Sequence, residues 1–515
     1  MKRLLDRIGG PRALLIVSLV TLVGGVVLPW HEMLLTIGAV MFVFFLVAAG
    51  SPARTGIDEV HGSARWPVVD EVERWMAKNT AAKVSGAVVE MGEMTDGTRS
   101  VPLSWKTDKH VLIVASAGSG KGTGLIIPNL LSYEGSVFVL DPKGENARAT
   151  VRRRNEFGPV HCLDPWGLTG RPQSRFNPLA RLCLEENASE VATEAASLAS
   201  ALVLPSAGDN NRYFTDSARQ LLEALIAYVV CDPQQRERAD LPLVRRLLTR
   251  ELRPTLEKMQ EAPFGPDTIR SNAGRMMLIG DNKEFGAIVS SAITETAFLD
   301  DPRLKDSLAC SPVGQIDFSE WLSGKTMSVY LCLPAPYFKT FNRWLRLIVT
   351  AALDEMMRRH KPPTKPVMFM LDELATLGRM DQVENAVGLA RGYGVQIWSI
   401  FQDIGQIRGA YQDKWSSFVG NAGLRLFFGT QDYETAKVVS DMIGDETVLI
   451  KRSNGNGGVD YKHHGRRLLM PDEVMRVRTE SMIVLIPGMK PVAARRVPYY
   501  QNPKLDELWD DPRRP

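Results

Sequence analysis

The chain has 515 residues, of which 44% are hydrophobic and 23% are charged. This length is too great for one ordinary domain, and the composition is normal for a globular protein, so we expect two domains and an appendage. The formal charge of +3 is nearly neutral for this length, so bulk charge does not indicate a nucleic-acid partner, and any basic surface must be local. The five scattered cysteines have no paired or metal-ligand spacing, which fits a reducing compartment.

Two uncharged apolar runs lie near the start of the chain, at residues 13–29 and 33–49. As helices, each would span about 25 Å, so residues 1–50 predict a two-helix transmembrane hairpin. A signal peptide is disfavoured because no small-residue cleavage pattern follows the first run, and a buried soluble hairpin because the runs are apolar on every side. Lys and Arg precede the first run and are missing from the turn, which predicts that the N-terminus and the main body are cytoplasmic.

The body alternates short apolar runs with helical patterns. The runs lie at residues 111–115, 137–141, 328–334, 367–372, 395–401, 424–429 and 482–487. They are apolar on both faces, as in parallel strands covered by helices, so the sequence predicts an α/β body of doubly wound type. Strand runs are scarce from about residue 182 to 322, which predicts an all-α domain inserted into a body formed by residues 51–181 and 323–515. The polar, glycine-rich stretch at 451–465 predicts a loop.

The stretch ASAGSGKGTG, residues 115–124, follows the first of these runs directly. This is the strand-to-helix turn that a phosphate-binding loop requires, where glycine N–H groups close around phosphate oxygens and a lysine adds charge. The candidate nucleotide-binding residues are Gly118, Ser119, Gly120, Lys121, Gly122 and Thr123. Ala115 replaces the usual opening glycine, and Gly122 replaces the usual magnesium-binding hydroxyl residue. The alternative is a glycine turn that binds nothing.

A second motif, VMFMLDELATLG, places Asp372 and Glu373 at the end of an apolar strand, where ligands of open α/β sheets bind. Asp372 is the candidate magnesium residue, and Glu373 the candidate acceptor of a proton from the attacking water. The alternative role for this pair is favourable negative charge at a helix start. A phosphate loop and an acidic strand end in one sheet are more specific together than either is alone.

Two further residues complete the candidate site. Gln402 follows the strand run at 395–401, where an amide would sense the terminal phosphate or orient water. Arg391 lies shortly before that run and is a candidate arginine finger for a neighbouring subunit. For both residues the alternative is an ordinary surface side chain.

The order of several motifs resembles that of the type IV coupling proteins, the membrane-anchored ATPases of bacterial conjugation and type IV secretion. The motifs are HGSARW at 61–66, GSGKGTG, FVLDPKGEN at 138–146, DPWG followed by FNPL, LDELATLG at 371–378, ARGYGVQ and LLMPDEV at 468–474. The resemblance covers nearly the whole chain. A glycine commonly follows the loop lysine in this family, as Gly122 does here.

The resemblance implies a hexameric ring of RecA-like P-loop NTPase domains in the bacterial inner membrane, with ATP and Mg²⁺ held between subunits. It also implies delivery of relaxase-bound single-stranded DNA to a type IV secretion channel. By matching motifs, Lys121 would bind phosphate, Arg391 would act across the subunit interface, and Gln402 would sense phosphate. Asp141 and Lys143 match a motif without a clear role. The very short turn between the two apolar runs puts periplasmic contacts with the channel in doubt.

Two other functions stay open. One is a recruitment platform for protein effectors, in which nucleotide binding gates docking without sustained pumping. The other is a DNA translocase of chromosome segregation, against which the HGSARW and LLMPDEV motifs count. The sequence shows no aromatic stacking platform for bases, so DNA as cargo rests on the resemblance.

Overall fold

The computed structural model describes residues 61–81, 86–203, 212–358, 362–454 and 458–512. By its contacts the chain divides into two units: Met1–Ser63 with Asp445–Arg466, and Ala64–Gly444 with Arg467–Pro515. The predicted transmembrane hairpin, residues 1–50, lies outside the described residues. In the ranges that the structure does describe, no helix has both the length and the apolar character to cross a bilayer.

The larger unit is built on one eleven-stranded sheet of order β2-β1-β13-β12-β9-β3-β8-β7-β4-β6-β5. Neighbours from β9 to β5 are parallel, whereas β12, β13, β1 and β2 extend the sheet antiparallel beyond β9. The strands are β1 (Ala87–Thr95), β2 (Ser100–Thr107), β3 (His110–Ala115), β4 (Val137–Leu140), β5 (Val160–Leu163), β6 (Ser328–Leu331), β7 (Val367–Leu371), β8 (Val395–Phe401), β9 (Ala422–Phe428), β12 (Ser481–Leu485) and β13 (Val492–Arg495).

All seven predicted apolar runs form strands of this sheet, which confirms the α/β body. The sheet is mixed, however, and the prediction that the run at 482–487 is a parallel strand is wrong, because β12 pairs antiparallel with β9. The prediction also missed β1, whose side chains alternate between buried and partly exposed. A strand with one partly solvated face carries a weaker apolar signal than a strand covered on both faces.

Alternate residues of the parallel strands contribute side chains to two hydrophobic cores, one on each face of the sheet. Leu112 of β3 belongs to one core, and its neighbour Ile113 belongs to the other. The first core is completed by the helices that follow β6 to β9, and the second by those that follow β3 and β4. The helices outside the segment between β5 and β6 are α4 (Val69–Ala81), α5 (Ile127–Ser132), α6 (Glu145–Asn155), α15 (Phe338–Met357), α16 (Asp381–Leu389), α17 (Ile404–Tyr411), α18 (Trp415–Asn421), α19 (Tyr433–Ile443) and α20 (Pro471–Met475).

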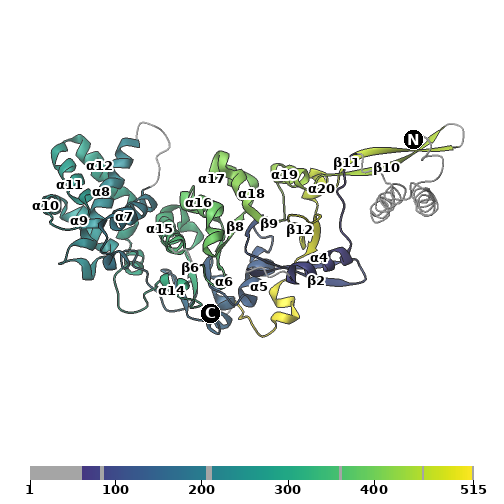
Figure 1. Cartoon of the computed structure of the whole chain (residues 1–515), viewed down its shortest axis with the longest axis horizontal. Helices are drawn as coiled ribbons and strands as arrows, with labels where there is room; N and C mark the ends of the chain where they lie inside the picture. Colours follow the sequence, from purple (N-terminus) through teal and green to yellow (C-terminus); the bar gives the residue numbers. More distant parts are fainter. Residues whose placement is uncertain (1–60, 82–85, 204–211, 359–361, 455–457, 513–515) are drawn as a thin grey trace, which may run out of the picture. The chain divides into compact units, whose positions relative to one another are not determined.

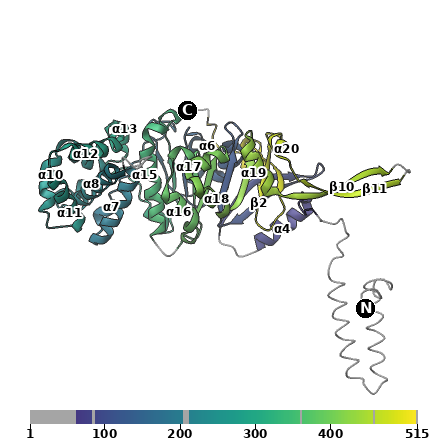
Figure 2. The ribbon, with the colours of Figure 1, turned by 90° about the horizontal axis from the view of Figure 1, so that it is seen from above.

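Between β5 and β6 the described residues form helices and short turns, with one isolated β-bridge between Arg175 and Gln315. The helices are α7 (Ala188–Leu202), α8 (Arg212–Cys231), α9 (Leu241–Arg250), α10 (Leu252–Gln260), α11 (Asp267–Ile279), α12 (Lys283–Glu295), α13 (Pro302–Ser307) and α14 (Ser319–Leu322). Figures 1 and 2 show α7 to α12 gathered at one end of the larger unit. One core cluster runs from the sheet into these helices, so the predicted boundaries of a separate all-α domain, 182–322, stay a prediction.

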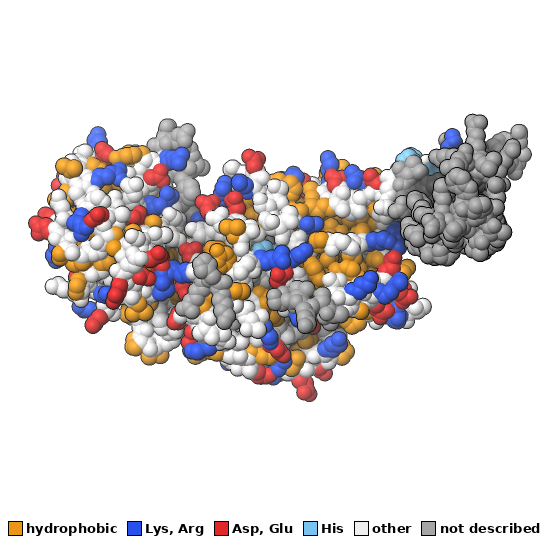
Figure 3. Space-filling model, viewed as in Figure 1, with side chains coloured by type: hydrophobic (Ala, Val, Ile, Leu, Met, Phe, Trp, Pro, Cys, Tyr) orange, Lys and Arg blue, Asp and Glu red, His pale blue; other side chains and the backbone are white. Residues whose placement is uncertain are grey.

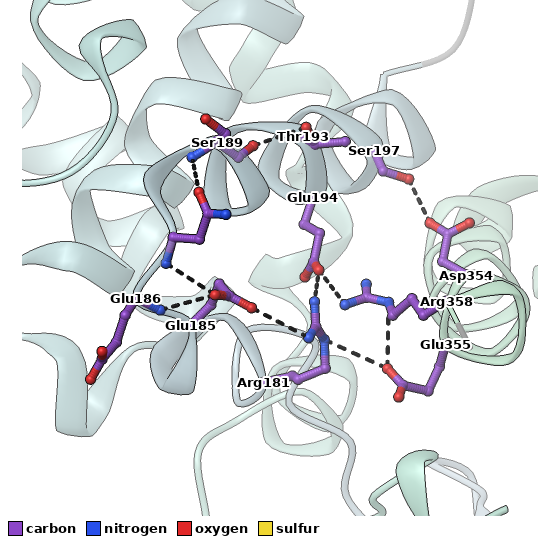
Figure 4. A network of polar contacts seen from close by, with 11 residues as sticks. Arg181, Glu185, Glu186, Ser189, Thr193, Glu194, Ser197, Asp354, Glu355 and Arg358 are labelled. Atoms are coloured by element: carbon purple, nitrogen blue, oxygen red, sulfur yellow. Dashed lines mark hydrogen bonds and ion pairs between the residues drawn. The ribbon is translucent and has the colours of Figure 1, made fainter. Parts of the chain in front are cut away.

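A buried network of charges joins this helical segment to α15 (Figure 4). Glu194 of α7 forms ion pairs with Arg181 and Arg358. The Nε atoms of these two arginines lie 3.6 and 3.5 Å from Oε2 of Glu355. Because both glutamates are only 9% exposed, loss of either arginine would leave two buried carboxylates beside a single cation. The network therefore holds α7 against the helix that leads from β6 to β7.

The smaller unit contains a β-hairpin, formed by β10 (Asp445–Asn454) and β11 (Gly458–Arg467). At its base, the N–H of His61 donates to Oγ1 of Thr447 at 3.1 Å. The prediction of a loop at 451–465 is therefore wrong. The stretch is rich in polar residues, so it lacks the regular apolar alternation that predicts a strand.

Candidate active site

The predicted phosphate loop links the end of β3 to a helical turn. Gly118 and Gly120 adopt φ values of +73° and +81°, which side chains rarely allow. A Cβ at Gly118 would meet nothing within 4 Å, so the space above the loop is open there. The chain then forms a π-helical turn, Gly122–Ile126, in which the N–H of Ile127 donates to the Gly122 carbonyl oxygen. This turn leads into α5, as a phosphate loop requires.

Three other predicted residues lie against the loop lysine. Nζ of Lys121 is 3.0 Å from Oδ1 of Asp372 and 2.7 Å from Oε1 of Glu373, both at the end of β7. Nε2 of Gln402, directly after β8, donates to the other oxygen of Glu373 at 2.8 Å. The three charged side chains are between 14 and 19% exposed. The carboxyl ends of three adjacent parallel strands thus bring these four residues together.

Glu373 has an unusual backbone conformation for a non-glycine residue, with φ of +57° and ψ of +38°. Its carbonyl oxygen accepts a hydrogen bond from Oγ1 of Thr376 at 2.7 Å, which helps to hold the turn after β7. Such left-handed residues cost free energy and cluster at functional sites. The turn directs the carboxylate of Glu373 between Lys121 and Gln402.

The site contains more carboxylates than cations. Burial acts to lower the pKa of Lys121, but the neighbouring carboxylates outweigh it and the pKa is raised, so the ammonium stays charged. Burial raises the pKa of Asp372, opposed by Lys121. Asp141, which follows β4, is 1% exposed, and burial together with the charge of Asp372 raises its pKa to about 7. This excess of acidic groups favours a further cation at the site.

Asp141 and Asn146 were not assigned a role from the sequence. Oδ2 of Asp141 accepts from the N–H of Ala147 at 2.9 Å, and Oδ1 accepts from Nδ2 of Asn146 at 3.3 Å. The bond leaves Oδ1 of Asn146 facing the phosphate loop, 3.8 Å from where a Cβ on Gly122 would lie. Asp141 thus orients a buried amide toward the position that lacks the usual hydroxyl. Lys143, of the same motif, is exposed.

Arg496, which follows β13, was also missed. Its Nη1 donates to the Gly120 carbonyl oxygen at 3.1 Å, and its guanidinium lies 4.2 Å from the centre of the Phe428 ring. A Cβ on Gly120 would come within 2.9 Å of this Nη1, so a side chain there would displace the guanidinium, while the positive φ by itself favours glycine. A pair of arginines before VPYY gives no sequence signal for such a contact.

Arg391 lies apart from the four clustered residues. Its Nε is 2.9 Å from Oδ2 of Asp108, and its side chain is 54% exposed. Asp108 precedes β3, whereas the phosphate loop follows β3, so the six residues of the strand separate the two by roughly 20 Å. Arg391 therefore cannot reach the phosphate loop of its own chain.

The donor set fits Mg²⁺ bound together with a nucleotide. Among the described residues, no group of three or more His, Cys, Asp or Glu side chains could hold a metal by itself. Mg²⁺ is usually bound by one or two carboxylates together with substrate phosphates and water, so Asp372 beside a phosphate loop suits it. Asn146 adds a neutral oxygen that faces Gly122.

A family model described as type IV secretory system conjugative DNA transfer matches residues 68–512. Protein VirD4 of Rhizobium radiobacter is 28% identical over 469 residues, which cover 87% of this chain and 65% of that protein. A conjugal transfer protein TraG of Agrobacterium fabrum is 26% identical over 492 residues, which cover 88% of this chain and 73% of that protein. The chain thus spans just under two thirds of the length of that VirD4.

Solved structures resemble the chain in fold. The bacterial conjugative coupling protein TrwBdeltaN70, in an unbound monoclinic form, has a TM-score of 0.63 and 15% sequence identity, and the match covers 84% of this chain and 93% of that one. TrwB in complex with ADP and Mg²⁺ has a TM-score of 0.60. The α/β sheet that carries the site therefore shares its fold with that coupling protein. Together with the family match over residues 68–512, these comparisons show that the chain belongs to the type IV coupling proteins of conjugative DNA transfer.

Proposed function

We propose that this protein is an ATP-hydrolysing coupling protein that delivers single-stranded DNA, bound to a relaxase, to a type IV secretion channel. The observation that carries the proposal is the contact of Lys121 and Gln402 with the acidic pair after β7. The TrwB structures with ADP and Mg²⁺ and with a non-hydrolysable ATP analogue support the same ligands here. Lys121 would bind phosphate and Asp372 would hold Mg²⁺, which neutralises phosphate charge. Glu373 would accept the proton of the attacking water, positioned with the help of Gln402.

We further propose that the protein acts as a homo-hexamer at the bacterial inner membrane, held by the hairpin of residues 1–50 with the body in the cytoplasm. The position of Arg391 supports action between subunits, because its guanidinium lies at the opposite end of β3 from the phosphate loop. A ring would bring this arginine to the nucleotide of a neighbour. The alternatives are a gated platform for protein effectors and a chromosome-segregation translocase.

ATP hydrolysis by the full chain with and without single-stranded DNA tests the proposal. A DNA motor should hydrolyse ATP faster when single-stranded DNA is added, and the increase should disappear in the Lys121→Ala variant. Hydrolysis that ignores DNA but responds to a relaxase would favour the recruitment platform. Stimulation by double-stranded DNA alone would favour the segregation translocase.

We also infer that Asn146 helps to hold Mg²⁺, a role that a hydroxyl side chain at position 122 usually performs in phosphate loops. Its Oδ1 faces Gly122, and its Nδ2 is held by Asp141. A neutral amide oxygen at this place would accept a hydrogen bond from a water of the hydrated Mg²⁺ or bind the ion directly.

The Asn146→Ala variant should bind ADP with a Mg²⁺ requirement raised about 10- to 100-fold, the usual loss when a supporting metal partner is removed. Titration of Mg²⁺ against bound fluorescent ADP measures this without any turnover. A second change, Gly122→Ser, supplies a hydroxyl where a Cβ makes only ordinary contact, so it should restore the requirement in the Asn146→Ala background. An unchanged Mg²⁺ titration in the single variant would exclude the role of Asn146.

A further inference from the structure

An aromatic cluster lies at the carboxyl edge of the sheet, beyond β5 and β6. Trp166 belongs to the loop after β5, and Tyr337 ends the short turn Ala335–Tyr337 after β6. Their rings are stacked, with centroids 5.2 Å apart and planes 25° from parallel. Phe341 of α15 completes the cluster, with its ring centroid 5.6 Å from that of Trp166.

The indole of Trp166 is the rigid centre of this cluster. The guanidinium of Arg303 lies 4.2 Å from the centre of its ring and is held by an ion pair with Asp301 at 2.7 Å. The indole N–H is buried and has no hydrogen-bond partner among the described residues, so ring contacts hold this side chain. Tyr337 therefore stacks on an indole ring whose other contacts, with Phe341 and Arg303, restrict its movement.

Tyr337 is the outer ring of the stack and is 41% exposed. An exposed tyrosine normally samples several rotamers, and a ligand that fixes it must overcome the lost entropy. Here the chain around it is stiff, because Pro334 and Pro336 precede it and its N–H donates to the Pro334 carbonyl oxygen at 2.9 Å. The stiff backbone and the stack on Trp166 therefore reduce the entropy that this ring loses when a ligand binds.

One cationic side chain contacts the inner ring of this stack, and another follows Tyr337 closely in the sequence. Lys339, two residues after Tyr337, is exposed, and the Arg303 side chain is 48% exposed. On the face of the molecule shown in Figure 3, Lys and Arg side chains are interspersed with Asp and Glu. Proteins bind single-stranded nucleic acid by stacking bases on exposed rings and contacting phosphates with cations, and this segment offers both kinds of side chain.

The cluster is separate from the phosphate loop. The loop follows β3 and Tyr337 follows β6, and these strands are four places apart in the sheet, or roughly 19 Å at the usual strand spacing. Both lie at the carboxyl edge of the parallel strands. A base on Tyr337 would therefore lie apart from a nucleotide bound at the phosphate loop.

We propose that Tyr337, supported by Trp166 and Arg303, is a stacking platform for a base of single-stranded DNA. The inference rests on the proposed function, because it names residues that contact the DNA. A platform of this kind would not distinguish one base from another, because every base offers a π-face to the Tyr337 ring.

The test measures binding of a fluorescent oligothymidylate to the full chain in detergent by anisotropy. The Tyr337→Ala variant should bind roughly 5- to 150-fold more weakly, which is the usual loss when one stacking ring is removed. Tyr337→Trp should bind as tightly as the wild type, because it keeps a ring. The matched control is Tyr433→Ala, which removes a tyrosine that is 64% exposed on α19, and it should leave affinity unchanged.

Two further measurements separate stacking from charge. The slope of log affinity against log salt should be unchanged in Tyr337→Ala and should fall by about 1 in Lys339→Ala, because only the lysine releases counterions. An oligonucleotide carrying 5-iododeoxyuridine should crosslink under ultraviolet light to the peptide that contains Tyr337. ADP binding should be the same in all these variants, which shows that they are folded.

Equal affinity of wild type and Tyr337→Ala for the oligonucleotide would overturn the platform while leaving the proposed function intact. The same holds if Tyr433→Ala weakens binding as much as Tyr337→Ala does. A wild-type chain that binds no single-stranded DNA would overturn both the platform and the proposed DNA cargo.

Discussion

The Glu373→Gln variant should bind ATP but hydrolyse it about 10²- to 10⁴-fold more slowly, the usual contribution of a general base. The amide keeps the shape of the side chain and an oxygen for the hydrogen bond from Gln402, but it cannot accept a proton from water. Lys121 keeps its ion pair with Asp372 at 3.0 Å, so the phosphate loop should stay in place. The backbone strain at φ +57° is the same for both side chains and does not confound the comparison.

Radiolabelled ATP retained by the Glu373→Gln chain after rapid gel filtration measures this trapped state. The control is Asp381→Asn, which removes one negative charge at the start of α16, where the side chain is 69% exposed and pairs with Arg379. It should retain wild-type turnover. If Glu373→Gln fails to retain nucleotide, Glu373 has a structural role in the loop, and another group must activate the water.

The Arg391→Ala variant should lose roughly 10³- to 10⁵-fold in ATP turnover, the range known for an arginine finger. The structure offers a simpler explanation that must be tested beside it. Arg391 pairs with Asp108 directly before β3, so its loss could disturb the strand that leads into the phosphate loop. Asp108→Asn breaks the same ion pair but leaves the guanidinium free to reach a neighbour. This control should keep activity close to that of the wild type.

Mixed rings then show whether Arg391 acts between chains. When Lys121→Ala and Arg391→Ala chains assemble together, some interfaces combine an intact phosphate loop with an intact arginine. ATP turnover should therefore pass through a maximum at intermediate ratios, above either variant alone. Dilution of wild-type chains with Lys121→Ala chains should lower activity in proportion, which shows that one dead site does not silence a ring. Mixed rings that form but never exceed their parents would contradict action in trans.

The four clustered site residues could be predicted from the sequence because each lies directly after an apolar strand run or within the loop that follows one. Parallel strands end at the same edge of a sheet, so Lys121, Asp372 and Gln402 converge without further information. Arg391 was predicted to act on a neighbour, and its place beside Asp108 is compatible with that prediction. A test of each role still requires the variants described above.

The antiparallel part of the sheet and the hairpin β10–β11 were harder to predict. Strands of the parallel region are buried on both faces and give continuous apolar runs, whereas β1 alternates and β10–β11 is polar. Such segments become strands because they pair with a neighbouring strand. Their own apolar content does not predict that pairing.

The sequence by itself determined the α/β class, the phosphate loop and the acidic strand end, because local periodicity and short motifs encode them. Only the tertiary structure showed that Asn146 faces Gly122, that Arg496 supports Gly120, and that Trp166 stacks on Tyr337. Each of these contacts joins segments that follow different strands of the sheet. The order in which strands pair decides which side chains meet, and that order depends on the packing of the whole chain.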